Sequence, residues 1–200
     1  MHFMIHHLKY LERDAARIQT WEVTSVDTDQ LMIILLAMAT GRITATGDDR
    51  TRVTIRRRGA DGLEYVNVNR VFEAVTNLED GDVSAWEGCS TWVDEHRGTR
   101  VALFVLVFLL TGCDFLPCFH GLPFLVMWQA LLKGLRVPGL FPKAILRFEG
   151  GSVFVDEDEV VKFLAVAFYY KRESAFSTTG TGAEDILDKQ AEGQTTSFVN

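Results

Sequence analysis

Residues 21–41 read WEVTSVDTDQLMIILLAMATG, and this stretch decides the fold class. Its first six residues alternate and are rich in β-branched side chains, which predicts a strand. Leu31 to Ala39 is apolar and consists of good helix formers. Asp27 or Thr28 can cap this helix, and Gly41 can end it in a left-handed turn. Strand, acidic turn and helix in this order indicate an α/β domain.

The rest of the chain supplies further strands, helices and one long loop. Strands are expected over residues 42–45, 52–58 and 63–66. Helices are expected over residues 8–19, 69–74 with Asn69 as the cap, 100–111, a segment that contains Trp128 and ends at Lys133, and 156–170. Residues 77–99, which include Trp86 and Trp92, are expected to form an irregular surface loop. The chain is long enough for one domain with a sizeable core, because 48% of its 200 residues are hydrophobic.

Charge is unevenly distributed along the chain. The formal net charge is −7, and residues 148–200 hold ten acidic side chains against four basic ones. This acidic balance argues against tight, sequence-independent binding of polyanions, which depends on Lys and Arg. Residues 50–58, however, contain five arginines and no acid, and Arg56, Arg57 and Arg58 are candidates for binding nucleic acid or acidic protein. Their structural alternative is a strand edge that charge keeps soluble.

The cysteines and the apolar segments bear on the compartment. Cys89, Cys113 and Cys118 form an odd set without a CxxC pair, which favours free thiols in an intracellular, reducing compartment. The first 17 residues have no apolar run of the kind found in secretory signals. The uncharged run over 101–113 is shorter than the roughly 20 residues that cross a bilayer, so we expect a fully buried helix there and no membrane span. Phe104 and Phe108 are expected to pack on Leu31 or Ile34.

Acidic side chains occur in three segments that can be considered together. Glu12 and Asp14 lie on the first predicted helix, Asp27 and Asp29 follow the first strand, and Asp114 follows the buried helix. Ligands of open α/β sheets bind outside the carboxyl ends of the strands, and clustered carboxylates need a cation or protons. Oxygen ligands of this kind suit Mg²⁺ or Mn²⁺.

Two of these segments resemble motifs of the flap-endonuclease or PIN-like (XPG-type) metal nuclease superfamily. SVDTDQLMIILL (25–36) resembles its strand ending in Asp-x-Asp, and FVLVFLLTGCDFLPCFHGLP (104–123) resembles its apolar helix leading to Gly-x-Asp. The resemblance implies a PIN-like open sheet flanked by helices over residues 1–173, followed by a polar acidic tail over 174–200. It also implies that Asp27, Asp29 and Asp114 are catalytic and hold metal, with their carboxylates within about 8 Å of a common point, as shared or paired ions allow. Glu12 and Asp14 resemble an upstream acidic motif with further metal ligands.

Two departures from the family pattern favour a pseudoenzyme. The family's first strand, with its own Asp, is absent ahead of Glu12, and Pro123 removes a backbone donor from the segment that grips a DNA backbone. We therefore expect a divergent, non-catalytic nuclease-fold subunit that serves a larger assembly, one that can contain RNA, and we expect its Mg²⁺ or Mn²⁺ to have been lost. The tail over 174–200 is expected to be held by a partner subunit. The alternative is a Mg²⁺- or Mn²⁺-dependent, structure-specific 5′ nuclease acting on DNA or RNA.

Each acidic candidate also has a structural explanation. Asp27 alone can serve as a helix cap, and Asp29 suits the positive end of the helix dipole. Glu12 and Asp14 can belong to the solvated face of an amphipathic helix. These alternatives remain open at the level of the sequence.

Overall fold

The computed structural model describes residues 20–25, 27–48, 50–59, 62–80, 83–112, 119 and 121–178. The protein is an α/β protein with open, mixed sheets and helices, as predicted. Its elements follow one another in the order β1 (Thr20–Thr24), α2 (Thr28–Ala39), β2 (Arg52–Gly59), β3 (Gly62–Asn67), α3 (Val68–Thr76), β4 (Glu79–Asp80), β5 (Val83–Ser84), η1 (Thr91–Asp94), α4 (Thr99–Leu110), α5 (Phe124–Leu135), β6 (Leu146–Glu149), β7 (Ser152–Val155) and α6 (Glu157–Thr178).

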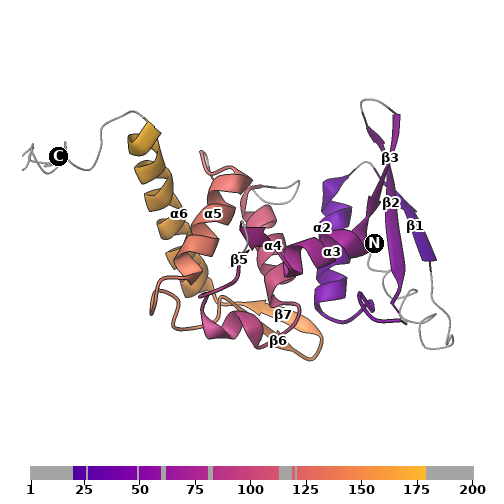
Figure 1. Ribbon diagram of the computed structural model, residues 1–200, viewed down its shortest axis with the longest axis horizontal. Coiled ribbons are helices and arrows are strands. Elements are labelled where there is room, and N and C mark those ends of the chain that lie inside the picture. Colours follow the sequence, from indigo (N-terminus) through magenta and orange to yellow (C-terminus); the bar gives the residue numbers. More distant parts are fainter. Residues whose placement is uncertain are drawn as a thin grey trace, which may run out of the picture.

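The main sheet has three strands in the order β1-β2-β3 and lies at one end of the molecule (Figure 1). β1 and β2 are parallel and joined through α2, whereas β2 and β3 are antiparallel neighbours. Alternation along β2 buries Val53 and Ile55 in the core, while Arg52 and Arg56 point to the opposite face. Figure 1 shows the described helices on one side of the sheet. The face with Val53 and Ile55 is therefore the one that these helices cover.

The prediction for α2 is confirmed at both ends. Asp27 is the N-cap, and its carboxylate accepts a hydrogen bond from the Asp29 backbone N–H at 2.9 Å. Thr40 is the C-cap, and Gly41 follows it with φ at 70°, a left-handed conformation that favours glycine. Between these ends, Ile34 and Leu35 are fully buried. The helix thus connects the carboxyl end of β1 to the core.

The prediction that Asn69 caps α3 is wrong. Asn67 is the cap, and its side chain accepts a hydrogen bond from the Arg70 N–H at 3.1 Å. Asn69 lies inside the helix and is 5% exposed. Its Oδ1 accepts from the Val53 N–H, and its Nδ2 donates to the carbonyl oxygens of Ala45 and Thr51, each at 2.9 Å. Asn69 therefore fastens the segment that leads into β2.

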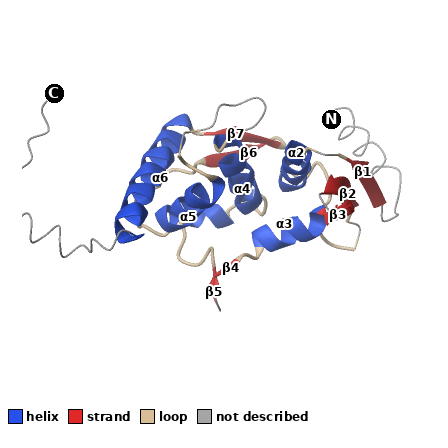
Figure 2. Ribbon diagram, turned by 90° about the horizontal axis from the view of Figure 1, so that it is seen from above, coloured by secondary structure: helices blue, strands red, loops and turns tan. Residues whose placement is uncertain are grey.

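The helices form successive layers away from the sheet. Figures 1 and 2 show α2 and α3 beside the sheet, α4 in the middle, then α5, with α6 outermost. Contacts join α2 to α4, α4 to α5, and α5 to α6, so one continuous core runs through the stack. The buried side chains of α4, such as Val101 and Leu103, lie at its centre.

The prediction of a fully buried 100–111 helix is correct in position and only partly correct in burial. α4 ends at the C-cap Thr111, but Phe104, Leu106 and Phe108 are half-buried. The ring of Phe104 makes edge contacts with Phe124 and Trp128 of α5, and the expected packing of Phe104 and Phe108 on Leu31 or Ile34 stays a prediction. The face of α4 that carries Phe104 is thus turned to α5.

Three other segments differ from the predictions. Residues 42–45 form no strand, because the N–H groups of Arg42 and Ile43 bond to the Ala37 carbonyl at the end of α2. The 77–99 segment contains the short β4–β5 hairpin and η1, and its Trp86 and Trp92 are buried rather than at the surface. The β6–β7 hairpin was not predicted. The final helix was predicted, and it continues to Thr178, beyond the start of the proposed tail at residue 174.

No helix in the described ranges combines the length and the apolar character needed to cross a membrane.

Candidate functional site

Asp27 and Asp29 lie where β1 passes into α2. The Asp27 N–H donates to the Ser25 Oγ at 3.0 Å, and the Asp27 carboxylate accepts from the Asp29 N–H at 2.9 Å. The Ser25 N–H in turn bonds to the Arg56 carbonyl at 2.9 Å, which extends the β1–β2 ladder by one residue. The helix-cap interpretation of Asp27 is therefore confirmed. A capping carboxylate retains a second oxygen, so capping and a further ligand are chemically compatible.

The other acidic candidates lie outside the described residues. These are Glu12, Asp14 and Asp114, so their predicted convergence with Asp27 and Asp29 remains a prediction. Among the residues that the structure describes, no group of three or more His, Cys, Asp or Glu side chains could hold a metal ion. The described carboxylates alone do not fit a two-metal site, and no chemical step through Mg²⁺ or Mn²⁺ is derived from them.

The three predicted arginines do not act as one group. Arg57 lies directly opposite Glu64 on β3, and its Nε is 2.8 Å from the Glu64 carboxylate. Arg56 belongs to the other face, where its guanidinium lies 3.3 Å from Glu22 and donates to the Thr24 Oγ1 at 3.1 Å. Strand alternation accounts for this division, because successive side chains point to opposite faces. Arg58 shares the face of Arg56.

We call the face of the sheet turned away from the helices the outer sheet face. Its members alternate along each strand with residues of the opposite face and are Glu22 and Thr24 of β1, Arg52, Thr54, Arg56 and Arg58 of β2, and Leu63 and Tyr65 of β3. Tyr65 lies opposite Arg56 and is 60% exposed, and Leu63 lies opposite Arg58 and is 64% exposed. Three arginines, one glutamate and an exposed aromatic ring therefore share one surface.

Sequence reasoning placed Arg52 among the five arginines of residues 50–58 without assigning it to one face with Arg56 and Arg58, and it missed Tyr65. The signal was present, because the period of two in residues 52–58 assigns Arg52, Arg56 and Arg58 to one face. Tyr65 could be added only once the β2–β3 register was known. A run of adjacent arginines in a strand is thus divided by the fold, and residues farther apart in sequence are brought together.

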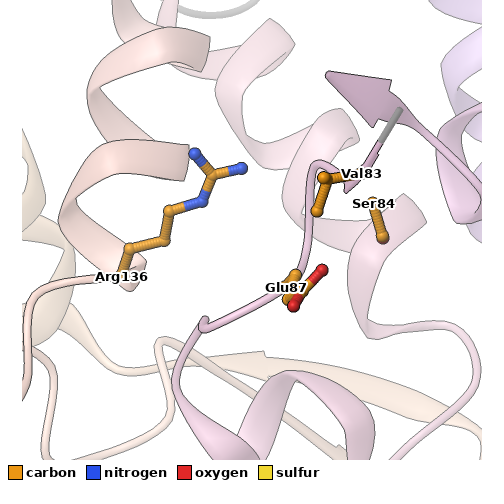
Figure 3. Close-up of a pocket in the computed structure, with 4 residues that line it drawn as sticks. All are labelled: Val83, Ser84, Glu87 and Arg136. Carbon is orange, nitrogen blue, oxygen red and sulfur yellow. The ribbon is translucent and has the colours of Figure 1, made fainter. Parts of the chain in front are cut away.

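A shallow cavity of about 390 Å³ lies between the end of α5 and the β4–β5 hairpin. Figure 3 shows the Arg136 side chain extending toward it from one side, with Val83, Ser84 and Glu87 on the other. The Arg136 guanidinium donates to the Ala85 carbonyl at 2.8 Å. This bond ties the hairpin segment to α5, so the arginine has a structural role at the cavity wall.

A second cavity of about 300 Å³ lies beside the end of α2 and is lined in part by Thr40, His96 and Arg97. His96 is held on both sides, since its ring stacks on Phe148 and its Nδ1 accepts from the Gly98 N–H at 3.0 Å.

Cys89 does not have the environment of an activated nucleophile. Burial raises the pKa of its thiol, and the positive charge of Arg136 only partly opposes that rise. A raised pKa reduces the thiolate fraction near neutral pH, whereas reactive cysteines have a lowered pKa. We conclude that Cys89 is a packing residue between the hairpin segment and Arg136. Cys113 and Cys118 lie outside the described residues.

Comparison with known proteins found no matching family model, no matching curated protein and no matching solved structure. Function is therefore argued from the geometry described above.

Proposed function

We propose that this protein is a divergent, non-catalytic subunit of PIN-like nuclease fold that binds an extended single strand of nucleic acid, RNA above all, as part of a larger assembly. The observation that carries the proposal is the outer sheet face, where Arg52, Arg56 and Arg58 lie in one row beside the exposed ring of Tyr65. The partner subunits expected from the sequence belong to the same proposal.

The chemistry of this row suits a sugar-phosphate backbone. Alternate side chains on a strand recur about every 6.6 Å, so Arg56 and Arg58 can each reach a different phosphate of an extended strand. Arg guanidinium groups bind phosphate oxygens in a bidentate manner. An exposed tyrosine provides a face on which a base can stack, an interaction worth about 1–3 kcal/mol per base. The exposed ring of Tyr65, opposite Arg56, is in position for this role.

The charge distribution favours weak binding within an assembly over tight binding by the isolated chain. The Glu22 carboxylate already forms an ion pair with Arg56, whose Nε lies 3.3 Å away. A phosphate must therefore displace Glu22 or bind Arg56 beside it. The formal net charge of −7 adds a repulsive background. Affinity should therefore depend strongly on salt, and a partner that supplies further contacts would raise it through effective concentration.

The test measures fluorescence anisotropy of a labelled oligouridine RNA with the full chain at several salt concentrations. The triple variant Arg52→Gln, Arg56→Gln, Arg58→Gln should bind much more weakly, and the magnitude of the slope of log K against log salt should decrease by about 2, since each phosphate contact on a single strand contributes about 0.7. Tyr65→Ser should weaken binding roughly tenfold or more through lost stacking.

A matched control removes the same charge from exposed positions elsewhere: Arg97→Gln, Lys143→Gln, Arg147→Gln. Equal losses in the two triple variants would mean that net charge alone drives the association. That result, or a wild-type chain that fails to bind at low salt, would refute the proposal.

A metal-dependent 5′ nuclease is the second candidate, and the position of Asp27 and Asp29 at the carboxyl end of β1 favours it. The variant Asp27→Ser separates the two roles of Asp27, because serine also caps a helix but provides no carboxylate. Cleavage of flap or single-stranded substrates in Mg²⁺ or Mn²⁺ that is abolished in Asp27→Ser and Asp114→Ala would establish the nuclease. We expect no such cleavage by the wild-type chain.

A further inference from the structure

The outermost helix, α6, has two apolar faces. Phe163 and Ala167 are fully buried on the inner face, which packs against α5. On this side Lys133 of α5 lies 4.6 Å from the ring centroid of Tyr170. Figures 1 and 2 show α6 at the far end of the helix stack, with no described element beyond it. Its other face is therefore at the surface of the described structure.

This second face carries large apolar side chains. Val161 is 65% exposed, Phe168 47% and Tyr169 63%. Phe154 and Val155, at the end of β7 just before α6 begins, are also about half exposed. Exposed apolar side chains that share one face of a helix are a candidate interaction site.

The residues of this face follow the helical repeat. Asp158, Val161, Ala165, Phe168 and Arg172 are spaced three and four apart and form a single row, which we call the outer row. All five are exposed. Along the helix the row consists of an acid, an apolar residue, the small Ala165, a second apolar residue and a base.

The order of the outer row is self-complementary. Asp158 and Arg172 are each seven residues from Ala165, which places both about 10.5 Å from it along the axis. Val161 and Phe168 are four and three residues away, at about 6 and 4.5 Å. A two-fold axis through Ala165 therefore brings Val161 of one copy beside Phe168 of the other, and Asp158 beside Arg172.

We propose that two copies of this chain associate through the outer row, with their α6 helices antiparallel and crossing at Ala165. The small side chain of Ala165 permits close approach at the crossing, and Val161 and Phe168 supply the apolar contact. A parallel pairing would instead place Asp158 against Asp158 and Arg172 against Arg172. Arg172 also has contacts within its own chain, and only its charge and its position along the helix matter for the pairing.

A second copy is the occupant because one surface supplies both halves of the contact, as an isologous two-fold interface requires. The contact consists of one helix row, which is at the small end of specific interfaces. The dimer should therefore be reversible and depend on protein concentration. This inference goes beyond the proposed function and does not depend on it.

Sedimentation velocity of the full chain over a range of concentrations tests the proposal. The wild type should pass from monomer to dimer as its concentration rises. Val161→Glu should weaken this association at least tenfold, because it introduces a charge into the centre of the contact. Leu63→Glu is the matched control, since Leu63 is 64% exposed, close to the value for Val161, and belongs to β3 at the opposite end of the molecule. Circular dichroism should show native helix content for both variants.

Charge exchange tests the two-fold arrangement itself. Asp158→Arg alone sets two positive charges against each other at each end of the contact, because the new arginine meets Arg172 of the other copy. Arg172→Asp alone sets two negative charges against each other, because the new aspartate meets Asp158. Each variant should therefore associate more weakly than the wild type.

Mixing the two charge variants should restore association. In an equimolar mixture the heterodimer pairs the new arginine of one copy with the new aspartate of the other at one end, and the unchanged Arg172 with the unchanged Asp158 at the other end, so both end pairs are complementary. The double variant Asp158→Arg, Arg172→Asp likewise reverses the charge at both ends and makes both pairs complementary again. It should recover the association at moderate salt that each single variant loses. A wild type that stays monomeric, equal effects of Val161→Glu and Leu63→Glu, or a double variant as weak as the single ones would overturn the proposal.

Discussion

Replacement of Asn69 provides the sharpest test of how the sheet is held. Asn69 is buried within α3 and makes three hydrogen bonds of 2.9 Å to the backbone around the start of β2. Two of them join Val53 and Thr51, which flank Arg52 of the outer sheet face, and the third joins Ala45. Asn69→Ala removes the side-chain amide, so three backbone groups lose their hydrogen-bond partner at once, and a space is left where the amide was.

The expected cost follows from these bonds. A typical hydrogen bond contributes about 1 kcal/mol net, and a buried group left without a partner costs about 1–3 kcal/mol. Three such bonds give about 3–5 kcal/mol, from which roughly 0.6 kcal/mol is recovered because alanine is the better helix former. We therefore expect Asn69→Ala to lower the free energy of unfolding by about 3 kcal/mol. Asn67→Ala, which removes only the exposed cap, should cost about 1 kcal/mol.

Urea unfolding followed by tryptophan fluorescence measures both variants. With an m-value of about 2 kcal/mol/M, the midpoint should fall by about 1.5 M for Asn69→Ala and about 0.5 M for Asn67→Ala. The two asparagines are two positions apart, so the comparison holds helix and composition constant. If Asn67→Ala were as costly as Asn69→Ala, the buried amide network would not have the role assigned to it.

Two further predictions concern close packing and pH. Gly98→Ala should destabilise the protein by about 1–3 kcal/mol or more, because an added Cβ would overlap the Ala39 carbonyl oxygen, and a fall in melting temperature measures this effect. In a Cys113→Ser, Cys118→Ser background, alkylation at pH 8 should be slower for Cys89 than for a free thiol, because burial raises the pKa of the Cys89 thiol. Because the folded state favours the neutral thiol, the contribution of Cys89 to stability should be complete below the pKa of the unfolded thiol and should be lost as pH rises through the raised pKa of the folded state. An ordinary alkylation rate, or a stability that does not change with alkaline pH, would contradict this assignment.

Local signals in the sequence were sufficient for α2 and its ends. Asp27 and Gly41 act through hydrogen bonds and backbone angles within a few residues of the helix, and such contacts are visible in a pattern of about 20 residues. The same reasoning failed at Asn69 because Asn67 and Asn69 have identical capping chemistry. The bonds that distinguish them reach Val53, 16 positions away, and Ala45, 24 positions away.

The candidate site shows the same division between local and distant information. The Asp27 and Asp29 turn was located from sequence, and its capping role is confirmed. The outer sheet face was only partly predicted, because Tyr65 joins the arginines through the antiparallel register of β3. Residue spacing fixes the face on which a side chain lies within one strand, but the pairing of strands determines its neighbours.

The serial stacking of layers has a consequence for how the protein opens. Among the described elements the main sheet contacts α3 through β2, α6 contacts chiefly α5, and α4 has α2 and α3 on one side and α5 on the other. A fluctuation that lifts α6 from α5 need not disturb β1, and fraying of β1 need not reach α6. Amide protons at the two ends should therefore exchange with solvent through separate local openings. Those of α4, enclosed between the ends, should exchange only when the whole core comes apart.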